Sequence, residues 1–489
     1  MIGEVTRAIH GSGIKNVVLK SKSGRAGLSS ILTLGRRAPT NFCSARHNHS
    51  GSDTNDNKKW SLRRKQEHQY NTLLTRTDAS YDIRGDSAEI GATLLEALRL
   101  QWAYGFPHTP EGISQLTHGF HYYPAAMQPA TAKLILEEDC ILPGKTLLDP
   151  FCGGGTTLIE GMRDGRVTFG SDTSPLALFV ASGRTWLPKD GDIDLLRESV
   201  ARVVSEASSS SCEDGNDKAG MITRKSWQGV KDGIDGILNY GMEDSDDKAA
   251  AQIIRTTLAP TLWFCYNAAF EQANRSRHKR DDITSASQYF EQTVEEYLRG
   301  IGELSEASGG MSQSPRLLHS DARLLKLDNG TKVDAILTSP PYPGVYDYMK
   351  HAREQRAKLK TNVAHHHVSK ENTVGDFMTT DIPSSRNWPD TWSRGEIGSN
   401  KSLRKNWKTF KSDWQRDTDD WIAQMAFLLG ASGSRMAVMI GDGFGIDVLE
   451  STLAATRRLP EDIGLELVAS ATLRRKGERT EHMVLLERT

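Results

Sequence analysis

Asp149-Pro150-Phe151-Cys152-Gly153-Gly154-Gly155-Thr156 is the stretch of sequence that decides the fold. It follows a short apolar segment, Thr146 to Asp149, and leads into Thr156 to Arg163, which carries apolar residues on one side as a helix would. A glycine turn between a strand and a helix lets the backbone approach a ligand closely, and the helix N-terminus then points at that ligand. We therefore expect a strand, a ligand-binding turn and a helix here.

Short apolar or β-branched segments recur after residue 140 and alternate with helix-like stretches. They are Thr146 to Asp149, Val167 to Asp172, Arg316 to Ser320, Val333 to Ser339, Arg435 to Gly441, Leu465 to Thr472 and His482 to Glu487. Such alternation predicts an α/β fold, with a parallel sheet and helices on both faces. Only a loop around Gly477 joins the last two segments, so we expect them to pair as an antiparallel hairpin.

Composition limits the class of protein. With 489 residues, 37% of them apolar and 25% charged, the chain is large enough for one big domain or two. No apolar run approaches the roughly 18 residues of a membrane span, so we expect no membrane contact. The formal net charge of −1 means that any nucleic-acid surface must be a local patch.

The chain shows no pattern typical of a metal site. Its five cysteines have neither CxxC nor Cys/His spacing, which argues against structural zinc and against a disulfide framework. We interpret the triplet His365-His366-His367 as a polar loop, because it lacks partners at ligand spacing. The sequence therefore predicts no metal.

A second motif, Ser339-Pro340-Pro341-Tyr342, ends the apolar segment Val333 to Ser339. In a doubly wound sheet both motifs would lie at the carboxyl ends of neighbouring strands, where such folds bind ligands. The pair resembles S-adenosylmethionine-dependent amino-methyltransferases that act on nucleic acids, whose glycine motif reads Asp-Pro-Phe-x-Gly-x-Gly-Thr. The resemblance covers about residues 118–182 and 315–489. It implies a Rossmann-like methyltransferase fold: a seven-stranded, mostly parallel sheet with one antiparallel strand, plus a helical insertion.

The resemblance also implies S-adenosylmethionine as the cofactor. Asp172 stands where the family binds the ribose hydroxyls, with a helix-capping role as the alternative. Asp321 stands where the family receives the adenine amino group, with a turn-capping role as the alternative. The segment His121 to Met127 resembles one that helps to close the pocket in bacterial DNA amino-methyltransferases. The expected cofactor-binding residues are Asp149, Pro150, Phe151, Gly153, Gly155, Thr156, Asp172 and Asp321.

The Ser-Pro-Pro-Tyr motif suits methyl transfer to an exocyclic amino group. That nitrogen is a poor nucleophile, because its lone pair is delocalised into the ring. We expect the Ser339 hydroxyl and the Pro340 carbonyl to accept its two hydrogens, while Pro340 and Pro341 stiffen the turn. Tyr342 would offer a face on which the base stacks. These four residues are the predicted catalytic residues.

The serine form of the motif resembles DNA cytosine-N4 methyltransferases more than the Asp or Asn forms of adenine-N6 and guanine-N2 enzymes. We therefore expect a nucleic-acid partner, with DNA favoured over RNA and cytosine N4 favoured over adenine N6. One alternative is a tRNA or rRNA guanine-N2 methyltransferase, because RNA enzymes of this type share the motif order. Another is a catalytically silent nucleic-acid-binding protein that retains the fold. The sequence does not indicate an oligomeric state.

The resemblance and the composition together suggest domain boundaries. Residues 1–58 are basic and acid-poor at their start, as in a transit peptide, so we expect a mitochondrial address; a retained basic tail is the alternative. Residues 59–117 are interpreted as an N-terminal extension. The methyltransferase domain would span 118–489, with an insertion at about 183–314 and a substrate-recognition segment at about 343–416.

Aromatic residues lie among lysines in that last segment. Trp407, Phe410 and Trp414 could therefore contact nucleic acid. Their helical spacing instead favours a core-facing stripe, with the lysines in solvent.

Overall fold

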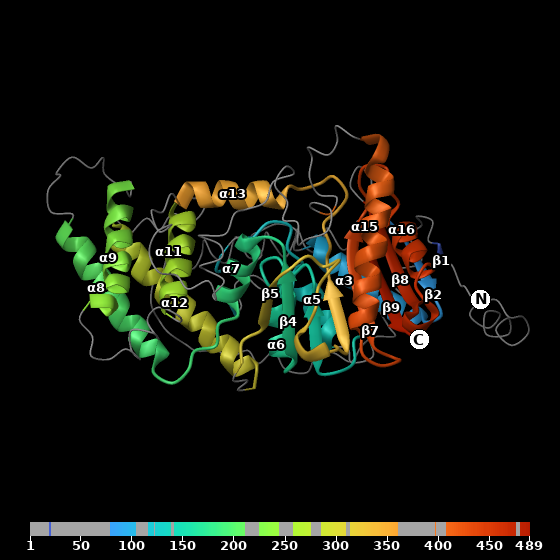
Figure 1. The fold of residues 1–489 in the computed structure, drawn as a ribbon, viewed down its shortest axis with the longest axis horizontal. Helices are drawn as coiled ribbons and strands as arrows, with labels where there is room; N and C mark the ends of the chain where they lie inside the picture. Colours follow the sequence, from blue (N-terminus) through green and yellow to red (C-terminus); the bar gives the residue numbers. More distant parts are fainter. Residues whose placement is uncertain are drawn as a thin grey trace, which may run out of the picture.

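The computed structural model describes residues 19–20, 79–103, 116–121, 123–137, 141–210, 224–243, 258–274, 285–309, 313–359, 397, 407–475 and 480–489. Over these residues the chain is an α/β protein, with one mixed sheet between helices and a group of helices at one end of the molecule (Figure 1). The predictions of a transit peptide and of a loop at His365-His366-His367 fall outside the described residues, apart from Leu19–Lys20.

In chain order the strands and α-helices are β1 (Leu19–Lys20), β2 (Ala79–Gly85), α3 (Ala88–Ala103), α5 (Pro129–Glu137), β3 (Thr146–Asp149), α6 (Thr156–Arg163), β4 (Val167–Asp172), α7 (Pro175–Arg184), α8 (Asp192–Ser210), α9 (Arg224–Glu243), α11 (Ala259–Asn274), α12 (Ala286–Ala307), β5 (Arg316–His319), β6 (Ala335–Thr338), α13 (Tyr348–Leu359), α15 (Trp407–Leu428), β7 (Arg435–Gly441), α16 (Val448–Thr456), β8 (Leu465–Arg475) and β9 (Glu481–Arg488). All seven segments expected after residue 140 are strands, with small shifts at their ends.

The strands follow the order β1-β2-β8-β9-β7-β6-β3-β4-β5. From β7 to β5, each neighbouring pair is parallel. β9 lies between β7 and β8 and runs antiparallel to both. The α/β class, the parallel pairing of the strands from β7 to β5 and the antiparallel pairing of the last two strands are therefore confirmed.

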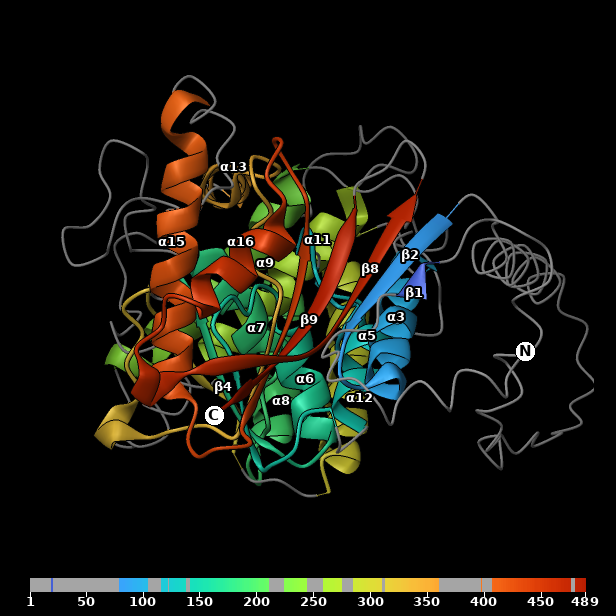
Figure 2. The ribbon, with the colours of Figure 1, turned by 90° about the vertical axis from the view of Figure 1, so that its right-hand side faces the viewer.

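The prediction of seven strands with one antiparallel strand was wrong, because the described part of the sheet has nine strands and both β2 and β9 run antiparallel to β8. β2 pairs antiparallel with β8 from Ala79↔Arg475 to Gly85↔Ala469, and β1 pairs with β2 (Figure 2). The pattern of β2 was too weak to identify, since Ile83 is its one buried apolar side chain among those described. Part of the segment interpreted as an N-terminal extension thus lies in the sheet.

Helices cover both faces of this sheet. Leu147 and Leu337 point to the face packed by α3 and α5, whereas Leu148 and Ile336 point to the face packed by α15 and α16. Burial on both faces explains why the central strands are apolar almost throughout.

The predicted insertion supplies α8, α9, α11 and α12, which gather beyond β5 at one end of the molecule (Figure 1). Their shared core includes Trp227, Phe264 and Tyr297, and it extends to Tyr123 and Tyr348 near the carboxyl edge of the sheet. None of the described helices is long and apolar enough to cross a bilayer.

The core-facing interpretation of the aromatic stripe is confirmed for Phe410 and Trp414. Both lie on α15, and their side chains are 5% and 2% exposed.

Leu98 on α3 is fully buried where this helix packs against the sheet. If α3 belongs to the folded domain, Leu98→Ala will lower the free energy of unfolding by about 2–5 kcal/mol. Urea unfolding of the two proteins measures this difference. Leu195→Ala is the matched control, since Leu195 on α8 is exposed and its loss should change stability by less than about 0.5 kcal/mol. Equal effects of the two substitutions would contradict the packing of α3.

Candidate active site

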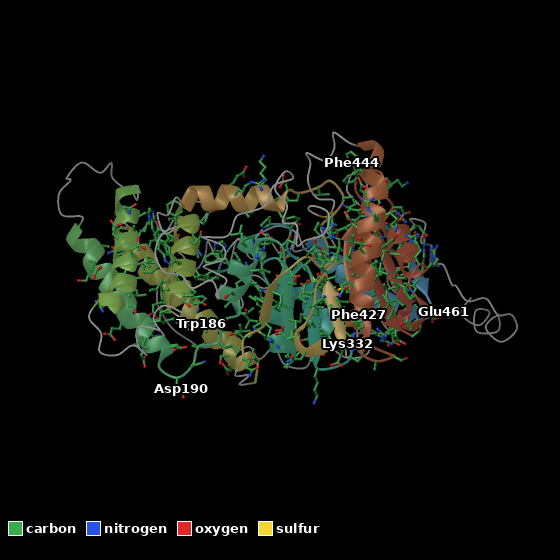
Figure 3. All side chains as sticks on the ribbon, in the orientation of Figure 1. Trp186, Asp190, Lys332, Phe427, Phe444 and Glu461 are labelled. Carbon is green, nitrogen blue, oxygen red and sulfur yellow. The ribbon has the colours of Figure 1, made fainter. Side chains whose placement is uncertain are left out.

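A cavity opens at the carboxyl edge of the central strands. Figure 3 marks the two edges of the sheet: Phe444 follows β7 at this edge, whereas Lys332 precedes β6 at the opposite one. Of the residues predicted from the sequence, the cavity wall includes Asp149, Pro150, Phe151, Gly153, Thr156, Asp172, Asp321, Ser339 and Pro341. Gly155, Pro340 and Tyr342 lie beside this wall, in the same two motifs.

The glycine turn is shaped by backbone angles that favour glycine. Gly153 has φ 49° and Gly155 has φ 82°, both in the left-handed region. A Cβ atom on Gly154 would also lie 2.8 Å from Cβ of Tyr123. The segment around Tyr123 therefore lies directly over the glycine turn. Its resemblance to a pocket-closing segment of DNA amino-methyltransferases predicts this position.

Asp172 ends β4 in the cavity wall. Its Oδ2 accepts a hydrogen bond from the Gly153 N–H at 3.0 Å, and its Oδ1 accepts one from the Ser174 N–H at 2.8 Å. Burial raises the pKa of Asp172 to about 6, although these amide bonds favour the charged form. Each carboxylate oxygen has further acceptor capacity, so hydroxyl groups of a ligand could bind here.

Asp149 joins the two motifs. Its Oδ1 accepts a hydrogen bond from the Thr338 hydroxyl at 2.7 Å and one from the Phe151 N–H at 3.1 Å. Burial raises the pKa of Asp149 to about 6, while the Thr338 and Thr157 hydroxyls and the Phe151 amide oppose that rise. Asp149 ends β3 and Thr338 ends β6, so this contact holds the glycine turn beside the Ser-Pro-Pro-Tyr turn.

Asp321 has a strong protein partner that the sequence did not reveal. Arg323 Nε lies 2.9 Å from Asp321 Oδ1, and an Arg323 terminal nitrogen lies 2.6 Å from Oδ2. The same guanidinium binds Asp417 Oδ1 on α15 at 2.9 Å. Asp321 thus anchors a buried ion-pair network in the wall, and this uses much of its capacity to accept further hydrogen bonds.

Some residues of the Ser-Pro-Pro-Tyr turn line the cavity, and others pack against the rest of the protein. Ser339 lies half-buried in the cavity wall, whereas the Pro340 side chain is buried. The Tyr342 ring packs against Gly441, where an added Cβ would lie 2.6 Å from the ring. The Tyr342 hydroxyl donates to Glu481 Oε1 at 3.4 Å. Tyr342 is therefore held against β7 and β9 rather than in the cavity wall.

Arg323, Tyr348 and Ile397 are among the residues of the wall to which the sequence analysis gave no role. The Tyr348 ring stacks on Tyr123 with centroids 6.4 Å apart. Tyr348 follows the Ser-Pro-Pro-Tyr motif by only six positions, so its nearness to the site could have been noticed. Across the described residues no group of three or more His, Cys, Asp or Glu side chains could hold a metal ion.

Comparison with known proteins adds to this geometry. Residues 120–171 match a family model described as RMKL-like, methyltransferase domain. Over this part, the chain is similar to methyltransferase domains. The Type II methyltransferase M.MvaI of Kocuria varians is 40% identical over 83 residues. That similarity covers 17% of this chain and 18% of the length of M.MvaI. The match to this family model includes the segment from Tyr123 to Met127, the glycine motif and β4 as far as Ser171.

The raised pKa of Asp172 predicts how stability depends on pH. Between about pH 4 and 6 the unfolded chain ionises at Asp172 while the folded chain retains its proton, so the free energy of unfolding falls as pH rises. Asp172→Asn should reduce that fall by about 2 kcal/mol. Urea unfolding between pH 4.5 and 7, without added ligand, measures it.

Asp190→Asn is the control for this measurement, because Asp190 is exposed on the loop between α7 and α8 (Figure 3). It should leave the pH dependence unchanged. A pH dependence that Asp172→Asn also leaves unchanged would contradict the burial of an ionisable Asp172.

Proposed function

We propose that this chain is an S-adenosylmethionine-dependent methyltransferase that acts on an exocyclic amino group of a nucleobase in nucleic acid. Cytosine N4 of DNA is the favoured target and adenine N6 the related one. The observation that carries the proposal is that Asp172 and Ser339 line the same cavity, at the carboxyl ends of the strands on either side of β3. One cavity can therefore bring a cofactor site and an amine site together.

The residues of the cavity suit S-adenosylmethionine, which supplies an activated methyl group when bound. The Asp172 carboxylate offers acceptors to ribose hydroxyls, at about 1.5–3 kcal/mol per charged hydrogen bond. Gly153 and Gly154 line the cavity beneath Tyr123, and α6 begins at Thr156 with its N-terminus directed at the turn. The segment from Tyr123 to Met127 lines the same cavity beside the turn.

Ser339 and Pro340 would receive the target amine. The Ser339 hydroxyl oxygen and the Pro340 carbonyl accept its two hydrogens, which favours the tetrahedral nitrogen whose lone pair can attack. Two successive prolines fix their own φ angles and so hold these acceptors in place. Orientation of the reactants can contribute about 7–11 kcal/mol, so a proton-transfer network is not required for a large acceleration.

The carboxylates of the cavity favour catalysis over a silent binding role. Asp149 is buried and Asp172 is half-buried, and desolvation raises the pKa of each to about 6. Burial of charge costs stability, and sites with perturbed carboxylates are typical of function. Serine at the head of the second motif supports DNA cytosine as the target, and the basic, acid-poor first 50 residues support a mitochondrial substrate.

The test is transfer of labelled methyl from S-adenosylmethionine by a chain that starts at Lys59, offered mitochondrial DNA and RNA side by side. We expect N4-methylcytosine in the digested DNA. Ser339→Ala should slow transfer by about 100-fold, because it removes an acceptor used in the transition state, while the dissociation constant for S-adenosylmethionine changes less than about twofold. Ser208→Ala, at an exposed position on α8, is the matched control and should keep full activity.

Label in RNA guanine would replace the DNA proposal with guanine-N2 methylation of RNA. Label in neither nucleic acid, with the cofactor still bound, would contradict a nucleic-acid methyltransferase and favour a protein substrate or a silent binding module.

A further inference from the structure

We propose that Tyr348 supplies the aromatic face against which the target base lies, in the role that the sequence predicts for Tyr342. The proposal rests on the proposed function, because it concerns where such an enzyme would hold the nucleobase. Its basis is the position of the two tyrosines: Tyr348 lines the cavity, whereas the Tyr342 ring packs against the sheet.

Tyr342 is held by contacts with β7 and β9. A Cβ atom on Gly441 would lie 2.6 Å from the Tyr342 ring, so the ring fills the space beside that glycine. The Tyr342 hydroxyl donates to Oε1 of Glu481, the first residue of β9, at 3.4 Å. The Tyr342 ring therefore serves to pack the Ser-Pro-Pro-Tyr turn against the sheet.

Tyr348 lies in the cavity wall itself. It shares this wall with Ser339 and Pro341, two residues of the Ser-Pro-Pro-Tyr turn. Tyr348 is half-buried, so part of its surface is open to a ligand. An aromatic ring in this position can hold the plane of a base while the Ser339 hydroxyl accepts a hydrogen from the amino group of that base.

Neighbouring rings fix the orientation of the Tyr348 ring. It lies nearly parallel to the Tyr123 ring, with an interplanar angle of 14° and centroids 6.4 Å apart. The Tyr346 ring is tilted by 53° to it, with centroids 4.9 Å apart. Aromatic pairs at such separations attract each other. The Tyr348 ring is therefore ordered before a base binds, which reduces the entropic cost of binding.

The backbone of Tyr348 is fixed as well. Tyr348 is the first residue of α13, which runs across the side of the molecule at which the parallel strands end (Figure 1). Asp347 caps this helix, because its Oδ1 accepts a hydrogen bond from the Lys350 N–H at 2.8 Å. One turn further on, Ala352 is fully buried in the core that the insertion helices share. The insertion thus supports the helix that carries Tyr348.

Stacking on a base differs in its consequences from support of the glycine turn. Tyr123 covers that turn, so a Tyr348 that only supported Tyr123 would act on cofactor binding. A Tyr348 that stacks on the base acts on the nucleic-acid substrate and leaves the cofactor affinity unchanged. Stacking also depends on the flat face of the ring and not on its hydroxyl group.

Tyr348→Leu and Tyr348→Phe together test the proposal. Leucine keeps apolar bulk but has no flat face, so kcat/KM for methylation of mitochondrial DNA should fall by about 5- to 150-fold. Phenylalanine keeps the face, so Tyr348→Phe should stay within about threefold of the native value. The dissociation constant for S-adenosylmethionine, measured by calorimetry, should change less than about twofold in both variants.

Tyr81→Leu is the matched control. Tyr81 is a half-buried tyrosine on β2, opposite Leu473 in the register with β8 and outside the cavity wall. The same substitution there should leave both measurements unchanged. If Tyr348→Leu is too unstable to assay, Tyr348→Met replaces it, because methionine also lacks a flat face and adapts to the space that it fills.

A native kcat/KM in Tyr348→Leu would overturn the role of Tyr348. A loss in Tyr348→Phe equal to that in Tyr348→Leu would do the same, as would a cofactor affinity that falls as much as kcat/KM. A native chain that transfers no methyl group would instead refute the proposed function, and the inference would fall with it. The activity of the native chain alone distinguishes the two failures.

Discussion

The buried hydrogen bond from the Thr338 hydroxyl to the Asp149 carboxylate is the contact on which the candidate site depends. It joins the last residues of β3 and β6 at 2.7 Å, and the two motifs follow those residues directly. Asp149 is almost fully buried, so its negative charge is destabilised by the loss of hydration. Each hydrogen bond to the carboxylate is correspondingly strong. β3 and β6 are already paired at Leu147↔Ala335 and Leu148↔Ile336, and this contact extends their connection to the residues from which the two turns begin.

The remaining structure supports this junction from three sides. The insertion helices α8, α9, α11 and α12 share a core with Tyr123, whose side chain covers the glycine turn. Arg323 links Asp321 in the cavity wall to Asp417 on α15, so the long helix beside the sheet is tied to the same cavity. On the third side, Glu481 connects Tyr342 with Trp102 on α3. Segments far apart in the sequence thus act together on one cavity.

Much of this arrangement was accessible from the sequence because it is encoded locally. The strands from β3 to β9 are apolar runs with clear ends, and Gly153, Gly155 and the two prolines have roles that follow from backbone chemistry alone. β2 was missed because Ile83 is its one buried apolar side chain among those described, and α3 was missed with it. The Arg323 network and the contact between Trp102 and Glu481 were beyond reach, since no local pattern records which polar side chains meet across the fold. The packing of Tyr342 against Gly441 was also beyond reach, because the space beside Gly441 exists only once β7 is in place.

The central claim is that the two motifs form one site through Asp149 and Thr338, and a double-mutant cycle of Asp149→Asn and Thr338→Val tests it most directly. The free energy of unfolding and the dissociation constant for S-adenosylmethionine would be measured for the native chain, both single variants and the double variant. The account predicts a coupling of about 1–3 kcal/mol in unfolding, with the double variant binding the cofactor no more weakly than Asp149→Asn alone. Strictly additive effects in both measurements would contradict it.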